Sequence, residues 1–124
     1  MNDEKKLIIL VDDSEVNLHI GRNALAGKYA VLTAPSAVEL FSLLEKNTPA
    51  FILLDIDMPG MNGFEAITIL KTKKQTQNIP VIFLSSRDGT NDINTGFSLG
   101  AVDFIHKPYN PKQLLDRIAK AELI

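Results

Sequence analysis

The chain has 124 residues, the length of one domain, and nothing in it marks a domain boundary or an internal repeat. Hydrophobic residues make up 45% and charged residues 23%, a mix typical of globular rather than disordered proteins. A formal net charge of −2 gives no basic surface for nucleic acid or an anionic membrane, and the absence of cysteine excludes disulfides and thiolate metal sites. We find no signal peptide and no apolar run close to ~18 residues, so we expect a cytoplasmic location.

Short apolar runs alternate with helical patterns along the chain. The predicted strands are Leu7–Val11, Tyr29–Thr33, Phe51–Leu54, Val81–Leu84 and Val102–Ile105. The predicted N-caps of the second, third and fifth helices are Ser36, Asn62 and Asn110. Gly27 and Gly100 are expected to end the first and fourth helices. The fourth helix, Thr90–Leu99, is the weakest because Gly96 inside it costs ~1 kcal/mol relative to alanine.

This alternation predicts an α/β fold, a doubly wound parallel sheet with helices on both faces and right-handed crossovers. In such a sheet the C-terminal ends of all strands lie at one edge, where ligands bind. Polar residues follow four of the predicted strands: Asp12 and Asp13, Asp55, Ser85, and Lys107. Each alone has an ordinary explanation, as a helix cap, a loop hydroxyl or a solvated charge. Together they place three carboxylates, a hydroxyl and an ammonium group at one edge.

Asp55 is the centre of this group, because it follows four apolar residues of a strand predicted to be buried on both faces. A buried charge is tolerated only when it is paired or bound to metal. Three neighbouring carboxylates repel one another without a cation, and oxygen ligands suit a hard ion such as Mg²⁺. A carboxylate nucleophile, Mg²⁺, a lysine and a hydroxyl are the parts that phosphoryl transfer needs.

From Leu7 to the last helix, the chain resembles the response regulator receiver domain of two-component signalling. The resemblance is carried by four separated segments: Asp12-Asp13, Leu53–Gly63, Pro80–Ser86 and Leu99–Pro108. It implies a single receiver domain over residues 1–124, with a flavodoxin-like sheet of strand order 2-1-3-4-5. It also implies a signalling domain that catalyses only its own phosphorylation and dephosphorylation, rather than an enzyme acting on other substrates.

The same resemblance assigns a metal site around the phosphoacceptor. Asp55 corresponds to the residue that accepts the phosphoryl group. Asp13 corresponds to a direct ligand of Mg²⁺, or of Mn²⁺ in its place, and Asp12 to a residue that acts through a metal-bound water. The backbone carbonyl of Asp57 is expected to supply a further metal oxygen.

A second set of residues corresponds to the switch of the family. Lys107 pairs with the phosphoryl group, Ser85 is the switch hydroxyl, and Phe104 is the aromatic residue that rotates inward when the hydroxyl moves. A cis bond is expected before Pro108. The phosphoryl group is expected to come from a histidine kinase or a histidine phosphotransfer protein. Phosphorylation is then expected to change the face formed by the fourth helix, fifth strand and fifth helix, which would contact a second copy of the chain or a downstream effector.

Some assignments stay open at the level of sequence. Asp57 and Arg87 stand at the positions that tune the lifetime of the phosphoryl group in the family. Asp57 orients an attacking water, repels the phosphoryl oxygens, or is simply a solvated carboxylate. His19 and His106 have no partner at metal-ligand spacing, and we interpret both as structural or exposed. The chain is either a single-domain regulator or the receiver part of a longer protein.

Three other functions compete with this interpretation. Asp55-Ile56-Asp57 resembles the Asp-x-Asp motif of haloacid-dehalogenase-type phosphatases, but that family carries the motif after its first strand and this chain after its third. A flavin-binding module would need a phosphate loop where Asp12 and Asp13 stand, and their charges would repel phosphate. An interaction domain that is never phosphorylated is the third alternative.

Overall fold

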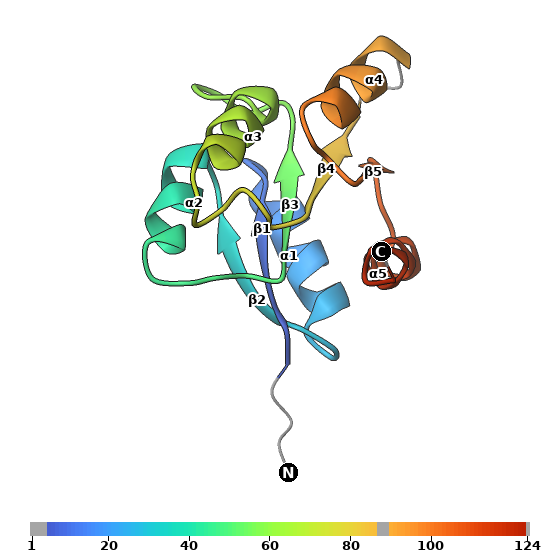
Figure 1. The fold of residues 1–124 in the computed structure, drawn as a ribbon. Coiled ribbons are helices and arrows are strands. Elements are labelled where there is room, and N and C mark those ends of the chain that lie inside the picture. Colours follow the sequence, from blue (N-terminus) through green and yellow to red (C-terminus); the bar gives the residue numbers. More distant parts are fainter. Residues whose placement is uncertain (1–4, 87–89, 124) are drawn as a thin grey trace.

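The structure, a computed structural model, describes residues 5–86 and 90–123. Its ten elements alternate along the chain (Figure 1): β1 Leu7–Val11, α1 Glu15–Leu25, β2 Ala30–Ala34, α2 Ala37–Leu44, β3 Phe51–Asp55, α3 Gly63–Thr72, β4 Val81–Ser85, α4 Thr90–Ser98, β5 Asp103–His106 and α5 Pro111–Ala121. Every predicted strand and helix is present, with ends that differ by a few residues.

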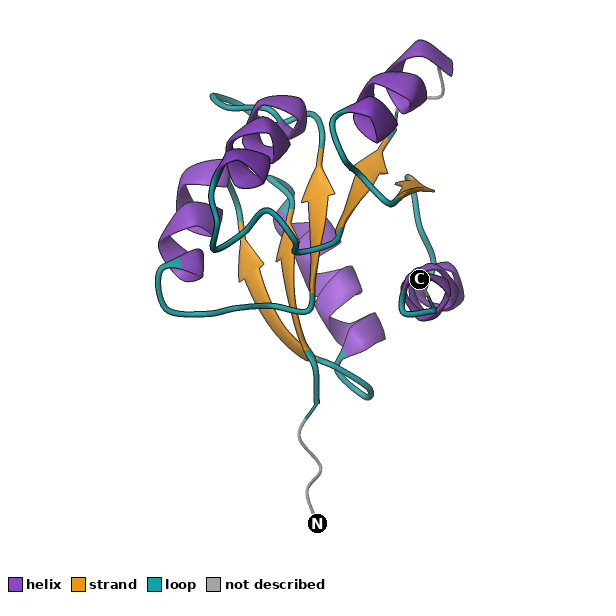
Figure 2. Ribbon diagram, viewed as in Figure 1, coloured by secondary structure: helices purple, strands orange, loops and turns teal. Residues whose placement is uncertain are grey.

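The strands form one parallel sheet in the order β2-β1-β3-β4-β5 (Figure 2). Both the order and the parallel arrangement confirm the predicted fold. The sheet is parallel because each strand returns to the same end through a helix, as a βαβ unit requires. β1, β3 and β4 lie inside the sheet, and all residues of β3 and β4 are buried.

Helices cover both faces of the sheet and create two separate cores. One core joins α2 and α3 to the sheet through Ala37, Leu40, Ala66, Ile67 and Leu70. The other joins α1 and α5 to the opposite face through Leu25, Leu114 and Ile118. Alternate residues of β1 divide between them, with Ile9 in the first core and Ile8 and Leu10 in the second. This explains why the central strands are apolar without alternation.

Helix starts follow the predicted capping chemistry. Ser36, Asn62 and Asn110 each accept a hydrogen bond from the backbone N–H three residues later. Asn62 also donates its own N–H to the side chain of Glu65, which completes a capping box. Gly100 has a φ of 113°, so it ends the fourth helical segment in a conformation that favours glycine.

α1 ends just before Gly27, as predicted, but Gly27 does not adopt the left-handed conformation that commonly follows a helix. The helix instead ends at Ala26 with right-handed dihedrals. The N–H groups of Lys28 and Tyr29 both donate to the carbonyl of Leu25, which caps the helix without glycine. Tyr29 is therefore part of this turn, and β2 begins one residue later than predicted.

Among the described residues, no helix is both long enough and apolar enough to cross a membrane. The cytoplasmic location expected from the sequence stays a prediction.

Gly63 begins α3 directly behind the end of β3, and its lack of a side chain allows this close approach. A Cβ atom there would lie 2.5 Å from the carbonyl oxygen of Asp55 and 2.8 Å from the Cα of Ile56. Because these are backbone atoms, we expect Gly63→Ala to lower the free energy of unfolding by about 1–3 kcal/mol in urea denaturation. Gly27→Ala is the control, because nothing lies within 4 Å of its added Cβ. Equal stability of the two variants would contradict the prediction.

Candidate functional site

The register of the sheet brings the predicted acidic residues together. Val11 at the end of β1 pairs with Leu54 of β3, so the following residues Asp12 and Asp55 leave neighbouring strands at the same level. Both are buried, with relative exposures of 0% and 1%. Asp13 is exposed beside them. One carboxylate oxygen from each of these three aspartates lies within 4.8 Å of the others.

Lys107 bridges the two buried carboxylates. Its Nζ lies 3.0 Å from Oδ2 of Asp12 and 2.9 Å from Oδ1 of Asp55. The backbone of Lys107 is fixed as well, since its N–H donates to the carbonyl of Ser85 over 2.7 Å. Burial lowers the pKa of the lysine, but its hydrogen bonds to Asp55 and Asp12 outweigh this and raise the pKa above the ordinary value. Lys107 is therefore charged at neutral pH.

Asp55 is held at one oxygen and open at the other. Oδ1 accepts from Lys107 and, over 3.3 Å, from the backbone N–H of Asp57. Oδ2 is buried and has no hydrogen-bond partner among the described residues. Burial is the main cause that raises the pKa of Asp55 to about 6. The hydrogen bond from Lys107 opposes this shift, and the negative charge of Asp12 adds to it. One lysine thus does not fully offset the negative charge of this site.

Asp12 is held more completely than Asp55. Its Oδ1 accepts from the backbone N–H of Ser14 over 2.9 Å. Its Oδ2 accepts from Lys107 and, over 3.3 Å, from the side-chain amide of Asn17. The carboxylate therefore sits in a fixed orientation at the first turn of α1.

The three aspartates have the chemistry of a divalent cation site. All available donors are carboxylate oxygens, the ligands that hard cations prefer. The unpartnered Oδ2 of Asp55 and the raised pKa of this residue both indicate a deficit of positive charge. Asp13 is exposed, which leaves the group accessible to an ion from solvent. The residues present therefore fit a metal ion of this class.

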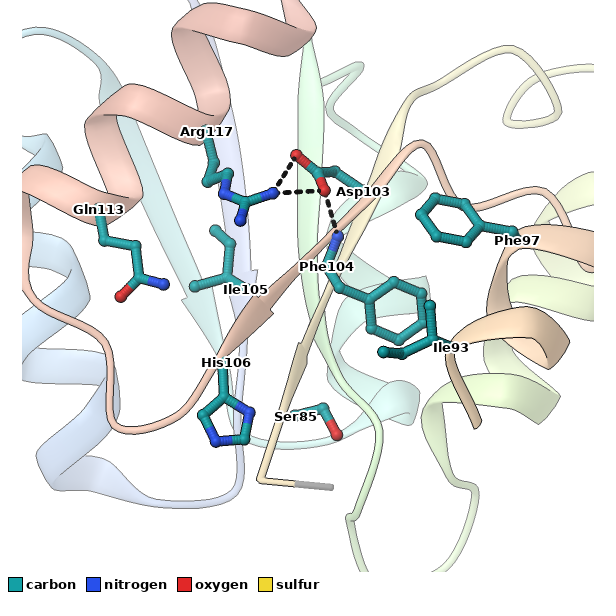
Figure 3. A pocket seen from close by; sticks show the side chains of 9 residues that line it. All are labelled: Ser85, Ile93, Phe97, Asp103, Phe104, Ile105, His106, Gln113 and Arg117. Carbon is teal, nitrogen blue, oxygen red and sulfur yellow. Dashed lines mark hydrogen bonds and ion pairs between the residues drawn. The ribbon is translucent and has the colours of Figure 1, made fainter. Parts of the chain in front are cut away.

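Ser85 and Phe104 connect this edge to a pocket between α4, β5 and α5 (Figure 3). Ser85 is buried at the end of β4 and lines the pocket together with Phe104 and Ile93. The Phe104 ring packs between Phe83, at 5.4 Å between centroids, and Phe97, at 5.2 Å. The two predicted switch residues, Ser85 and Phe104, therefore line one pocket.

The remaining predicted residues have varied outcomes. The Lys107–Pro108 bond is cis, in agreement with expectation. Asp57 is exposed next to the site, whereas Arg87 lies outside the described residues. His19 is exposed and shares a hydrogen bond with Asn23, and His106 is exposed at the mouth of the pocket. Both histidines agree with the interpretation as structural or exposed residues.

Two residues near the site have no recognisable signal in the sequence. Asn17 donates to Asp12 from the first turn of α1, and the hydroxyl of Tyr109 donates to the backbone carbonyl of Asn17 over 3.1 Å. They lie 92 residues apart in the chain. Neither the amide nor the tyrosine stands out in a helical or loop pattern, so only the packing of α1 against the segment after β5 reveals them.

Comparison with known proteins agrees with this geometry. Residues 8–119 match the profile of the response regulator receiver domain. The chemotaxis protein CheY homolog of Campylobacter jejuni is 32% identical over 114 residues, which cover 90% of this chain and 88% of that protein. The structure of the chemotaxis response regulator CheY4 of Vibrio cholerae superposes with a TM-score of 0.88 at 26% identity, covering 94% of this chain and 98% of that one.

Other relatives are longer than this chain. The transcriptional regulatory protein YvrH of Bacillus subtilis is 36% identical over 93% of this chain but only 48% of its own length. The response regulator PleD of Caulobacter vibrioides is 36% identical over 90% of this chain and 25% of its own length. The chain thus spans a quarter to a half of these relatives. With the family profile matched across nearly its whole length, the chain belongs to the response regulator receiver domain family of two-component signalling.

Proposed function

We propose that Asp55 is the phosphoacceptor of this receiver domain and that residues 1–124 act as one phosphorylation-controlled unit. The observation that carries the proposal is the state of the Asp55 carboxylate: Oδ1 is held by Lys107, while Oδ2 is buried without a partner. The held oxygen orients the group, and the other is left to act as a nucleophile. The donor of the phosphoryl group is a phosphohistidine on a histidine kinase or phosphotransfer protein.

The reaction exchanges one bond to phosphorus for another. Oδ2 of Asp55 attacks phosphorus, the P–N bond to the donor imidazole breaks, and an acyl phosphate forms. Lys107 lies within 3.0 Å of two site carboxylates and is charged, so it is placed to offset negative charge on the phosphoryl oxygens. The domain acts only on its own aspartate, and no other catalytic activity is proposed.

Mg²⁺, or Mn²⁺ in its place, is the cofactor that we propose for this site. Asp13 and Asp55 would hold the ion directly, with the backbone carbonyl of Asp57, and Asp12 would act through a bound water. Such an ion supplies positive charge that offsets the repulsion between the carboxylates and the incoming phosphoryl group. The negative charges of Asp12 and Asp13 also create the electrostatic potential that would attract the cation.

The output is a change of the α4-β5-α5 face. An aspartyl phosphate adds acceptor oxygens next to Lys107 and Ser85. We propose that Ser85 moves toward them and that Phe104 shifts into the space that Ser85 leaves. Because Phe104 contacts Phe97 on α4, this motion alters the surface available to a second copy of the chain or to a downstream effector. Neither nucleic acid nor a membrane is proposed as a direct partner of this chain.

We expect the protein to take up one phosphate per chain when it is incubated with Mg²⁺ and a small phosphodonor such as acetyl phosphate. Asp55→Asn removes the nucleophilic oxygen and is expected to abolish this labelling, as measured by intact-protein mass spectrometry or radiolabel. The matched control is Asp116→Asn on α5, where the carboxylate is exposed and pairs only with Lys112 among the described residues. Labelling of Asp55→Asn at the wild-type level would overturn the assignment.

Asp55 also gives the protein a distinctive pH dependence in the absence of divalent cations. Because its pKa rises from 3.8 to about 6 on folding, the folded state holds a proton that the unfolded state has already released. Stability is therefore lost as pH rises between these values, and the penalty is complete above pH 6.

Asp55→Asn removes this ionisation, so in chelator it should unfold at a higher temperature than wild type at pH 7.5. The expected gain is at most about 3 kcal/mol, and it should shrink toward pH 4. Thermal unfolding of both proteins across this pH range measures the effect. A gain of the same size at pH 4 and pH 7.5 would show that ionisation of Asp55 is not its cause.

Asp57 is proposed to shorten the lifetime of the phosphoryl group. Whether its carboxylate orients the attacking water or repels the phosphoryl oxygens, Asp57→Asn should lengthen the half-life of the phosphorylated protein. The measurement is loss of label after removal of the donor. An unchanged half-life would instead identify Asp57 as a solvated loop carboxylate.

A further inference from the structure

Asn17 reaches the acidic site from α1 and contacts it at a single point. Its side-chain Nδ2 donates to Oδ2 of Asp12 over 3.3 Å. Its backbone N–H donates to the hydroxyl of Ser14, the N-cap of the helix, over 3.2 Å. The amide is therefore placed by the start of the helix itself, and it is half-buried. This combination makes Asn17 a fixed donor rather than a mobile surface side chain.

Asn17 differs from the other donors to Asp12. The backbone N–H of Ser14 donates to Oδ1 of Asp12. The ammonium group of Lys107 contacts both Asp12 and Asp55. Asn17 is thus the one neutral side-chain donor to Oδ2 among the described residues. When Lys107 interacts with a phosphoryl group, the amide still satisfies this buried oxygen. Loss of every hydrogen-bond donor to this buried carboxylate oxygen would destabilise the folded protein strongly.

A second contact ties Asn17 to the segment that carries Lys107. Tyr109 follows Lys107 by two residues, is 8% exposed, and donates its hydroxyl to the backbone carbonyl of Asn17 over 3.1 Å. Burial and then the charges of Asp12 and Asp55 raise the pKa of Tyr109 above its ordinary value, so the hydroxyl keeps its proton. This bond fixes the start of α1 relative to the connection between β5 and α5.

Gly21 lies beside the Tyr109 hydroxyl and allows α1 to pack closely on β1. It lies one turn after Asn17 on the same helix and is buried. A Cβ atom at this position would lie 2.5 Å from Leu10 Cδ2 and 3.5 Å from the Tyr109 hydroxyl. The missing side chain therefore makes room for Leu10, and the Tyr109 hydroxyl lies at an ordinary contact distance from the same position. Polar contacts join Lys107 to Asp12, Asp12 to Asn17 and Asn17 to Tyr109, and the chain itself connects Tyr109 back to Lys107.

We propose that Asn17 is a positioning residue that orients Asp12 for the divalent cation, and that Tyr109 couples this orientation to the segment bearing Lys107. The proposal rests on the function proposed above. It follows from the general behaviour of groups that hydrogen-bond to metal-site carboxylates: they fix ligand orientation, and their loss weakens metal binding by about 10–100-fold. A purely structural role for Asn17 would change the stability of the protein without changing cation affinity.

The test compares Asn17→Leu with Asn23→Leu in the full chain. Asn23 is an exposed asparagine on the same helix whose amide bonds only His19 among the described residues, which makes it a matched control. Calorimetric titration with Mg²⁺ alone should give a dissociation constant about tenfold higher for Asn17→Leu. Asn23→Leu should bind as wild type does. At saturating Mg²⁺, phosphate labelling of Asn17→Leu should approach the wild-type rate, because the defect lies in cation binding.

An unchanged Mg²⁺ dissociation constant for folded Asn17→Leu would overturn the proposal. If the leucine variant does not fold, Asn17→Ala, which adds no apolar bulk, provides the same comparison.

Tyr109→Phe tests the second contact, from the Tyr109 hydroxyl to the carbonyl of Asn17. We expect Mg²⁺ affinity within about twofold of wild type but slower phosphate labelling, since about one hydrogen bond is lost. Labelling at the wild-type rate would remove Tyr109 from the proposal. Failure of wild type to be labelled at all would instead refute the proposed function, so the two failures are distinguishable.

Discussion

The structure depends on an electrostatic imbalance at the carboxyl edge of its sheet. Asp12 and Asp55 are both buried there, Asp13 lies beside them, and Lys107 bridges the buried pair. Burial, helped by the negative charge of Asp12 and opposed by the hydrogen bond from Lys107, raises the pKa of Asp55 to about 6. Under the proposed function, a cation and a phosphoryl group would relieve this unfavourable arrangement.

The parallel sheet places this acidic site close to the pocket between α4, β5 and α5. β3 and β4 are neighbours, so Asp55 and Ser85 end adjacent strands. From Ser85 the pocket passes to Phe104, whose ring packs against Phe97 on α4. Gly96 contributes by leaving space, since a Cβ there would lie 2.3 Å from Phe104 Cζ. The glycine that weakens α4 in the sequence thus also admits the aromatic ring to that helix.

Most of the fold was predictable because its signals are local. Apolar runs of four or five residues located the strands, and residues such as Asn62 marked helix starts by bonding within one turn. Parallel topology then required Asp12, Asp55, Ser85 and Lys107 to gather at one edge, and they do. The end of α1 before Gly27 was predicted as well, but not its capping: the N–H groups of Lys28 and Tyr29 donate to the carbonyl of Leu25, and Gly27 does not take a left-handed conformation.

The pattern of the chain was enough to establish an α/β fold with acidic residues at its carboxyl edge, since those features follow from periodicity and strand ends, and the motif segments supplied the resemblance to receiver domains. Tertiary packing was needed to show that Asp55 has one held and one free oxygen, and that Asn17 and Tyr109 support the site from segments 92 residues apart. Such contacts depend on how α1 lies against the segment after β5. No local pattern encodes that arrangement, because a hydrogen bond between distant segments exists only once the sheet has brought them together.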